Sequence, residues 1–312
     1  MTYYIAIDGG TTNTKVFLVA DGEIKGKIVT MGAKYNKDGD GYKQEIKAAI
    51  KQLLSDNSIA EKDISKILCS GMITSANGLC ELEHLYVPCG IKEMADGMYE
   101  TEIPEISSIK FAFIRGVKTS CKTIEDADMM RGEETEFIGI ADNSSADSVY
   151  VFPGTHSKII HTDSMGRICD FSTEFTGELI EVISKNSILR ESVDMSCSEF
   201  CEEYLLKGYN YATENGLNAA AFKVRVLGSL FKSSAAEVYS FFIGAVLSSE
   251  INNIKKTEKS NIAIVGKHPL CEATKIILNS VSDKNVVRIN TESSANAAVS
   301  GMIKVYETRC GK

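Results

Sequence analysis

Two short segments of this 312-residue chain carry glycine, threonine and lysine in the pattern of a phosphate-binding turn. Residues 3–19 read YYIAIDGGTTNTKVFLV and residues 148–162 read SVYVFPGTHSKIIHT. Each segment predicts two strands joined by a Gly-Thr turn. Glycine lets backbone N–H groups approach an anion, threonine hydroxyl groups donate to phosphate oxygens, and lysine adds positive charge. Two such turns predict a grip on the β- and γ-phosphates of one nucleotide.

The candidate phosphate ligands are Gly10, Thr11, Thr12, Asn13 and Lys15 in the first turn, and Gly154, Thr155 and His156 in the second. Asp8 ends the first predicted strand, where a carboxylate suits a phosphate site only if a cation lies between them. We therefore predict that Asp8 anchors Mg²⁺, directly or through metal-bound water. Each segment alone also fits an ordinary hairpin in which glycine supplies positive φ. His156 also fits a hydrogen-bonded turn residue.

An acidic segment lies between the two turns. Residues 129–141, MMRGEETEFIGIA, predict a partly buried helix whose first turn carries carboxylates. The helix macrodipole favours carboxylates there, which is a sufficient structural explanation. Phosphoryl transfer, however, needs a group that positions the attacking hydroxyl, and Glu133 or Glu134 could take its proton.

Composition limits the class of protein. A hydrophobic content of 44% and a charged content of 24% are typical of a soluble globular protein, and the length favours two domains. The net charge of −8 argues against nucleic acid and acidic membranes as partners. No apolar run is long enough to span a bilayer and no signal peptide precedes the first strand, so we expect a cytosolic protein. The nine cysteines form no paired framework, which favours reduced thiols packed mostly in the core.

The remaining elements must position these residues. A third strand is predicted after each hairpin, at 23–30 and 166–171, which gives two antiparallel meanders. Other predicted strands are 67–69, 109–114, 261–265 and 286–289, and predicted helices are 43–54, 179–184 with Thr176 as its N-cap, one from about 271, and 293–306. Ser196 with Glu199 and Ser234 with Glu237 both fit the S-x-x-E capping box.

Two Gly-containing stretches are candidate ligand contacts. Residues 70–78, SGMITSANG, fit either a helix start beside a ligand or a tightly packed loop. Gly266 follows the predicted strand 261–265, and a strand–Gly–helix junction suits the adenosine end of a nucleotide.

The order of these motifs carries a resemblance. DGGTTNTK at 8–15, RGEETEFIG at 131–139, FPGTHSK at 152–158 and IVG at 264–266 resemble the phosphate-1, connecting, phosphate-2 and adenosine elements of the sugar kinase, Hsp70 and actin superfamily. Within that superfamily, MRGEET, VYVFPGTHSK, DFSTEFTGEL and CSGMITSANG resemble the 2-dehydro-3-deoxygalactonokinase family over most of the chain.

The resemblance implies an α/β protein with two ribonuclease-H-like, actin-like ATPase domains around a nucleotide cleft. Residues 1–145 would carry phosphate-1 and the substrate loops, and residues 146–312 would carry phosphate-2 and the adenosine side. It also implies ATP and Mg²⁺, and a small sugar acid, 2-dehydro-3-deoxy-D-galactonate, phosphorylated on O6. An aldolase would then cleave the 6-phosphate in galactonate catabolism.

The resemblance also implies roles for single residues. Gly132-Glu133 stands where related carbohydrate kinases have Gly-Asp with a catalytic aspartate, so Glu133 is the first candidate base and Glu134 the second. The candidates for the substrate side are Arg131 and Arg115 as cations for the sugar carboxylate, with Thr74 and Asn77 lining the sugar site. Arg131 also fits a salt bridge to Glu134 or Glu136. The stretch VGKHP at 265–269 lacks the double glycine common in the superfamily, which leaves the adenosine contacts open.

Other readings of the sequence compete with this one. A kinase of the same fold could act on another keto-deoxy sugar acid, a neutral hexose or an amino sugar. A nucleotide-gated interaction protein is opposed by the chain's short length and lack of a separate peptide-binding domain. The sequence leaves the preferred epimer and the oligomeric state open, a homodimer included.

Overall fold

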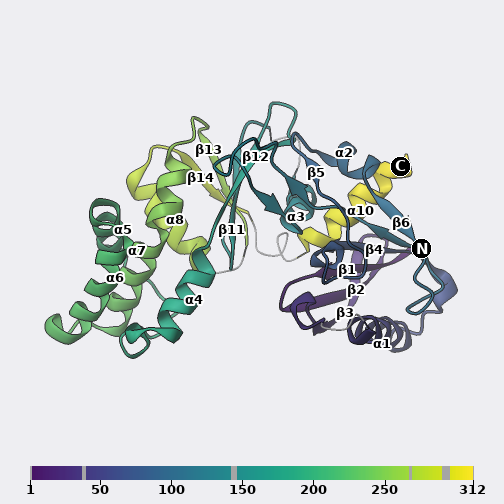
Figure 1. Cartoon of the computed structure of the whole chain (residues 1–312), viewed down its shortest axis with the longest axis horizontal. Helices are drawn as coiled ribbons and strands as arrows, with labels where there is room; N and C mark the ends of the chain where they lie inside the picture. Colours follow the sequence, from purple (N-terminus) through teal and green to yellow (C-terminus); the bar gives the residue numbers. More distant parts are fainter. Residues whose placement is uncertain (1, 37–39, 142–145, 267–268, 290–295, 312) are drawn as a thin grey trace. The chain divides into compact units, whose positions relative to one another are not determined.

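The computed structural model describes residues 2–36, 40–141, 146–266, 269–289 and 296–311 (Figure 1). These residues form two compact units. Unit 1 comprises Met1–Ala146, Thr162–Asp170 and Glu292–Lys312, and unit 2 comprises Asp147–His161 and Phe171–Thr291. The predicted domains, 1–145 and 146–312, are separated by a single boundary, which lies close to the boundary between Ala146 and Asp147. The packing also assigns two later segments, Thr162–Asp170 and Glu292–Lys312, to unit 1.

A six-stranded sheet forms the centre of unit 1, in the order β3-β2-β1-β4-β7-β6. Its strands are β1 (Tyr3–Gly9), β2 (Asn13–Ala20), β3 (Glu23–Met31), β4 (Ile64–Gly71), β6 (Tyr99–Thr101) and β7 (Phe111–Phe113). The strands β1, β2 and β3 are antiparallel neighbours, which confirms the first predicted meander. The strands β4 and β7 run parallel to β1, and β6 is antiparallel to β7.

Helices cover both faces of this sheet. They are α1 (Asp40–Asp56), α2 (Ile91–Asp96), α3 (Glu133–Ile140) and α10 (Ala297–Arg309). Helix α1 buries Ile46 and Ile50 against Ile5 and Ile7, the apolar face that the sequence predicts. Side chains alternate along a strand, so Tyr4 points to the opposite face, where its ring packs edge-on against Tyr306 of α10.

Unit 1 also contains a small three-stranded sheet in the order β5-β8-β9. Its strands are β5 (Leu85–Tyr86), β8 (Val117–Lys118) and β9 (Met129–Met130). The strand β8 is parallel to β5 and antiparallel to β9. The residues before β5, those before β8 and those after β9 therefore meet at one end of this sheet.

The sheet of unit 2 repeats the order of the first, as β12-β11-β10-β13-β14. Its strands are β10 (Val149–Phe152), β11 (Ser157–Thr162), β12 (Ile168–Glu174), β13 (Asn261–Ile264) and β14 (Asn285–Arg288). The strand β10 is antiparallel to β11 and parallel to β13, which confirms the second hairpin. Both sheets place a meander beside parallel strands, which is the predicted α/β fold of two ribonuclease-H-like sheets.

Five helices complete unit 2 in the described chain: α4 (Thr176–Asn186), α5 (Glu202–Asn215), α6 (Leu217–Val226), α7 (Ala235–Lys255) and α8 (Pro269–Val281). Figure 1 shows α5, α6 and α7 side by side, in agreement with their mutual contacts. Phe241 and Phe242 of α7 are buried in the core of this unit. Ser234 and Glu237 form the predicted capping box at the start of α7.

Two predicted helix starts are wrong. Ser196 does not begin a helix, because its hydroxyl donates to Asp194 at 2.6 Å and α5 begins only at Glu202. Thr176 is not an N-cap, because it lies inside α4 and its hydroxyl donates to Glu250 of α7 at 2.6 Å. In the second case a distant carboxylate outcompetes the local backbone for the hydroxyl group.

The nine cysteines are all free thiols. Only Cys69, Cys89 and Cys271 are buried, so core packing accounts for fewer of them than the sequence predicts. None of the helices in the described chain has the length and apolar character that crossing a bilayer requires.

Candidate active site

The first Gly-Thr turn joins β1 to β2 at the edge of the unit 1 sheet where the parallel strands β1, β4 and β7 end. Its backbone carbonyl groups are occupied, since Thr12 O accepts from Gly32 N at 2.9 Å and Thr11 O accepts from Lys34 N at 3.1 Å. The side chains of Thr11, Thr12 and Asn13 are exposed. The turn is thus anchored from one side and presents hydroxyl and amide groups on the other.

Asp8 pairs with Lys15 across the hairpin. The Lys15 Nζ atom donates to Asp8 Oδ2 at 2.7 Å, and the Asp8 side chain is 15% exposed. Burial alone would lower the pKa of Lys15, but attraction by Asp8 outweighs it and raises that pKa. The carboxylate of Asp8 therefore lies beside the turn with the Lys15 ammonium group as its ion-pair partner.

The parallel strands of unit 1 bring four sequence segments to the same sheet edge. Asp8 lies opposite Ser70 of β4, and Cys69 lies opposite Phe113 of β7. Because parallel strands end at a common edge, Arg115, two residues beyond Phe113, follows the same edge as Gly71. The fourth segment is Gly132, where an added Cβ atom would lie 3.6 Å from the Cα atom of Gly71.

The first two residues of α3, Glu133 and Glu134, differ in burial. Gly132 has φ +116°, a conformation that favours glycine. Glu134 is fully buried, with Oε2 accepting from Gly132 N at 2.8 Å and Oε1 accepting from Thr135 Oγ1 at 3.1 Å. Burial, with repulsion from Glu133, raises the pKa of Glu134 to about 8. Glu134 thus packs inside the helix start, while Glu133 is partly exposed.

Glu136 belongs to the same group of carboxylates, although no role in the site is predicted for it from the sequence. Burial raises its pKa to about 8, and repulsion from Asp8 and Glu133 adds to the effect while Lys15 opposes it. Glu136 follows Glu133 by three residues, the spacing of neighbours on one helix face, which is the signal that could have identified it.

The predicted substrate residues lie in three settings. Thr74 ends a short 3₁₀ turn (Met72–Thr74), is fully buried, and donates from its hydroxyl to Gly71 O at 3.0 Å. Asn77 is exposed, and its backbone carbonyl oxygen accepts from Asn36 Nδ2 at 2.7 Å. Residues 70–78 therefore comprise the end of β4, a 3₁₀ turn and a loop, and not the start of an α-helix. Arg131 and Arg115 are partly buried on the adjacent segments.

The described residues contain no group of three or more histidine, cysteine or acidic side chains placed to bind a metal ion directly. Mg²⁺ commonly keeps several waters and uses one or two carboxylates together with substrate phosphates. Asp8, a single carboxylate beside an exposed turn, fits that mode of binding.

The second Gly-Thr turn, between β10 and β11, is fastened to helix α4 in unit 2. Gly154 O accepts from Gly177 N at 3.1 Å, and Thr155 O accepts from Glu178 N at 3.0 Å. Thr155 and His156 are exposed. As in the first turn, the backbone carbonyl groups are used internally and the side chains face solvent.

The two basic residues of this turn have local partners. His156 Nε2 lies 2.7 Å from Glu178 Oε2, and its ring stacks on Phe175. Lys158 is buried and donates from Nζ to Thr173 Oγ1 at 2.5 Å. His156 thus makes the contacts of a hydrogen-bonded turn residue, and its phosphate contact stays a prediction.

Gly266 follows β13 with φ +125°. The strands β10 and β13 are parallel, so Gly266 and the Gly154 turn lie at the same edge of the unit 2 sheet. Helix α8 begins at Pro269, which confirms the strand–Gly–helix order. Lys267 and His268 of the VGKHP stretch lie outside the described residues.

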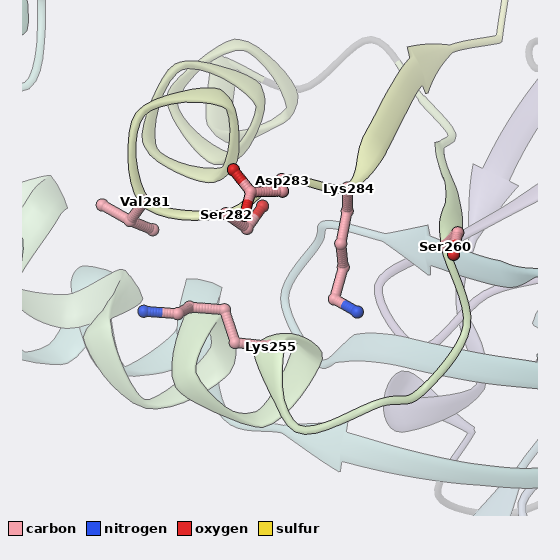
Figure 2. A pocket seen from close by; sticks show the side chains of 6 residues that line it. All are labelled: Lys255, Ser260, Val281, Ser282, Asp283 and Lys284. Atoms are coloured by element: carbon pink, nitrogen blue, oxygen red, sulfur yellow. The ribbon is translucent and has the colours of Figure 1, made fainter.

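A shallow cavity of about 380 Å³ lies elsewhere in unit 2 (Figure 2). It is lined by Lys255, Ser260, Val281, Ser282, Asp283 and Lys284. Ser260 and Lys284 precede β13 and β14, so this cavity borders the strand edge opposite to Gly266. Lys284 Nζ donates to Thr257 O at 2.7 Å and to Lys259 O at 2.9 Å. The cavity is thus separate from the predicted nucleotide site.

Comparisons with known proteins give the same family as the motifs. A model of the family described as 2-keto-3-deoxy-galactonokinase matches residues 8–305. The chain is 27% identical over 270 residues to the 2-dehydro-3-deoxygalactonokinase of Escherichia coli (strain K12), covering 81% of this chain and 80% of that protein.

Two further proteins add to this comparison. A Rhizobium meliloti (strain 1021) protein, named as a probable 2-dehydro-3-deoxygalactonokinase, is 27% identical over 195 residues. This match covers 61% of our chain and 59% of that relative, less than two thirds of its length. A crystal structure from Sinorhizobium meliloti superposes with a TM-score of 0.81 at 22% identity, covering 98% of this chain and 96% of that one, and so shares the fold.

The family model extends over nearly the whole chain, including both Gly-Thr turns and the Gly132-Glu133 pair. The chain therefore belongs to the 2-keto-3-deoxy-galactonokinase family.

Proposed function

We propose that this protein transfers the γ-phosphoryl group of ATP to O6 of 2-dehydro-3-deoxy-D-galactonate, with Mg²⁺ as the cofactor. The proposal is supported by family membership and by the 2-dehydro-3-deoxygalactonokinase name of its Escherichia coli relative. Free cysteines and a net charge of −8 support a cytosolic enzyme whose acceptor is a small molecule.

One observation supports the catalytic assignment above the others. The backbone of Gly132 lies against the end of β4, at the sheet edge that also carries Asp8 and the first Gly-Thr turn. A carboxylate at this edge, next to a phosphate-binding turn, is suitably placed to act on a hydroxyl group during phosphoryl transfer.

In the mechanism that we propose, Glu133 accepts a hydrogen bond from the O6 hydroxyl group and removes its proton as O6 attacks the γ-phosphorus. The hydroxyl groups of Thr11, Thr12 and Thr155 and the amide of Asn13 donate to phosphate oxygens. Asp8 would hold Mg²⁺ through water, and the ion, when bound, would neutralise charge on the phosphates. Gly266 marks the adenosine side, and Arg131, Arg115, Thr74 and Asn77 form the side of the acceptor sugar.

The test compares the two neighbouring acids. Glu133→Gln should lower kcat by about 10²- to 10⁴-fold, because the acceptor loses its base, and should leave the Kd for ATP nearly unchanged. Glu134→Gln should keep kcat within about tenfold, because the buried Glu134 already carries its proton for much of the time at pH 7.

Steady-state ADP release and ATP binding by calorimetry measure both quantities. Near-normal kcat in Glu133→Gln together with a large loss in Glu134→Gln would assign the base to Glu134. Turnover of neutral hexoses with no turnover of the keto acid would reject the proposed substrate class.

A further inference from the structure

We infer that Arg115 binds the carboxylate of the acceptor sugar acid, and that Arg131 is a positioning residue that holds the loop of residues 74–84 beside it. This inference rests on the proposed function. It assigns different tasks to two arginines that the sequence cannot distinguish.

The guanidinium group of Arg131 is hydrogen-bonded to the loop of residues 74–84. Its Nη1 atom donates to Thr74 Oγ1 at 2.6 Å and its Nη2 atom donates to Leu82 O at 2.5 Å. Nη2 also lies 3.4 Å from His84 Nδ1. These bonds tie both ends of the 74–84 loop to the residue that precedes Gly132. Losing them would release the loop, so Arg131 supports the site structurally.

His84 accepts in this contact because a guanidinium group can only donate. Its Nδ1 atom is therefore unprotonated and its Nε2 atom carries the hydrogen. Burial, with repulsion from Arg131 and Lys118, lowers the pKa of His84 to about 4. His84 is thus neutral near pH 7 and adds no cation to the site.

Arg115 differs from Arg131 in the contacts of its guanidinium group. No hydrogen bond or ion pair to its side chain occurs within the described residues, and its Nε atom is buried without a partner. The Arg115 side chain as a whole is only partly buried, so a ligand that brings an acceptor can reach its guanidinium group and pair donors that the described residues leave unpaired. A guanidinium group offers its donors as a planar fork that matches a carboxylate.

The fold places this arginine next to the acceptor site. Arg115 follows β7 at the sheet edge of Asp8 and Gly71, and it is close enough to Cys80 of the loop to oppose the rise in that thiol's pKa. The next residue, Gly116, packs so tightly that an added Cβ atom would lie 2.6 Å from Arg131 Cγ and 2.7 Å from His84 Cδ2. The unpartnered arginine therefore lies beside the held loop and close to the Gly132-Glu133 segment.

The experiment measures KM for the keto acid and for its neutral carboxamide analogue in the full-length protein. Arg115→Gln should raise KM for the acid about 10- to 100-fold with little change in kcat or in KM for ATP, because a charge-assisted bond present in both ground and transition states is lost. The same substitution should change kcat/KM for the carboxamide by less than about threefold, since that analogue carries no charge.

Two further variants separate binding from positioning. Arg131→Gln should lower kcat/KM for the acid and the carboxamide by the same factor, because a displaced loop affects both. Lys118→Gln is the matched control, because it removes one positive charge three residues further along the chain than Arg115, in β8. Lys118 lies over the Tyr86 ring, and the substitution should leave both values within about twofold.

An unchanged KM for the acid in Arg115→Gln, or an equal loss for acid and carboxamide, would overturn the inference. If Arg115→Gln does not fold, Arg115→Lys should give an intermediate KM for the acid, and an unchanged KM in that variant also overturns the inference. Wild-type enzyme that fails to phosphorylate the keto acid at all would instead reject the proposed function, so the two failures are distinguishable.

Discussion

Glu133 and Glu134 are the first two residues of helix α3, but their carboxyl groups lie in different surroundings. Glu134 is enclosed and bonded to Gly132 and Thr135, whereas Glu133 keeps partial contact with solvent. The sequence predicts both as candidates and cannot rank them by chemistry, because burial depends on packing against β4. The separation of Arg115 from Arg131 is hidden from the sequence for the same reason.

A third buried acid gives a prediction at this scale. Burial raises the pKa of Glu250 to about 7, against opposing hydrogen bonds from Thr176 and Ser157. Its Oε1 atom has no hydrogen-bond partner among the described residues. Because the folded state then binds more protons than the unfolded state between about pH 4.5 and 7, stability falls as the pH rises through this window.

Glu250→Gln should remove this part of the pH dependence. We expect the free energy of unfolding of the wild type to fall by roughly 3 kcal/mol more than that of the variant between pH 4.5 and pH 8. Urea titrations at both pH values give the comparison. Equal pH dependence in the two proteins would show that Glu250 titrates normally.

At the scale of elements, the hairpins and meanders are predictable because their signals are local. Each Gly-Thr turn and its flanking β-branched residues specify two strands without help from the rest of the chain. Thr176 fails as a predicted cap because its partner, Glu250, is 74 residues away. The sequence carries the hydroxyl group but no sign of which acceptor tertiary packing will supply.

The crossing of α3 with α10 gives an element-scale prediction. A Cβ atom added at Gly301 of α10 would lie 1.9 Å from Thr135 O, and one added at Gly139 of α3 would lie 1.9 Å from Ala297 O. Gly301→Ala should therefore force the helices apart and lower the free energy of unfolding by about 3 kcal/mol. It should also lower kcat, because α3 carries Glu133.

Thermal unfolding and steady-state rates measure these two effects. Gly228→Ala serves as control, because Gly228 is also helical but no atom lies within 4 Å of its added Cβ atom. That variant should unfold within about 1 kcal/mol of the wild type. A similar Tm in Gly301→Ala and Gly228→Ala would contradict the tight crossing.

At the scale of the whole molecule, the repeated sheet can be predicted from the repeated motif. Which segments of the chain make up each unit cannot be predicted in this way. No pattern in the sequence indicates that Thr162–Asp170 and Glu292–Lys312 pack in unit 1. Their membership depends on contacts such as that of α10 with α3, which join residues far apart in the chain.

Both units should contribute to nucleotide binding if each Gly-Thr turn contacts phosphate. Mg²⁺ with ATP at 100 times its Kd should stabilise the wild type by about 2.7 kcal/mol and so raise Tm by several degrees. Thr11→Val and Thr155→Val should each reduce this rise, because each removes a phosphate donor. Differential scanning fluorimetry measures the shift, and a full shift in either variant would exclude that turn from nucleotide binding.

The late position of α10 in the sequence has a consequence for biosynthesis. A ribosome translates every strand and helix of unit 2 before it reaches Ala297, where the last helix of unit 1 begins. Unit 1 must therefore lack α10, one of the helices that cover its sheet, until after the strands and helices of unit 2 have been synthesised. Nascent chains arrested before residue 297 should bind chaperones that recognise apolar surface, and should release them once α10 has emerged.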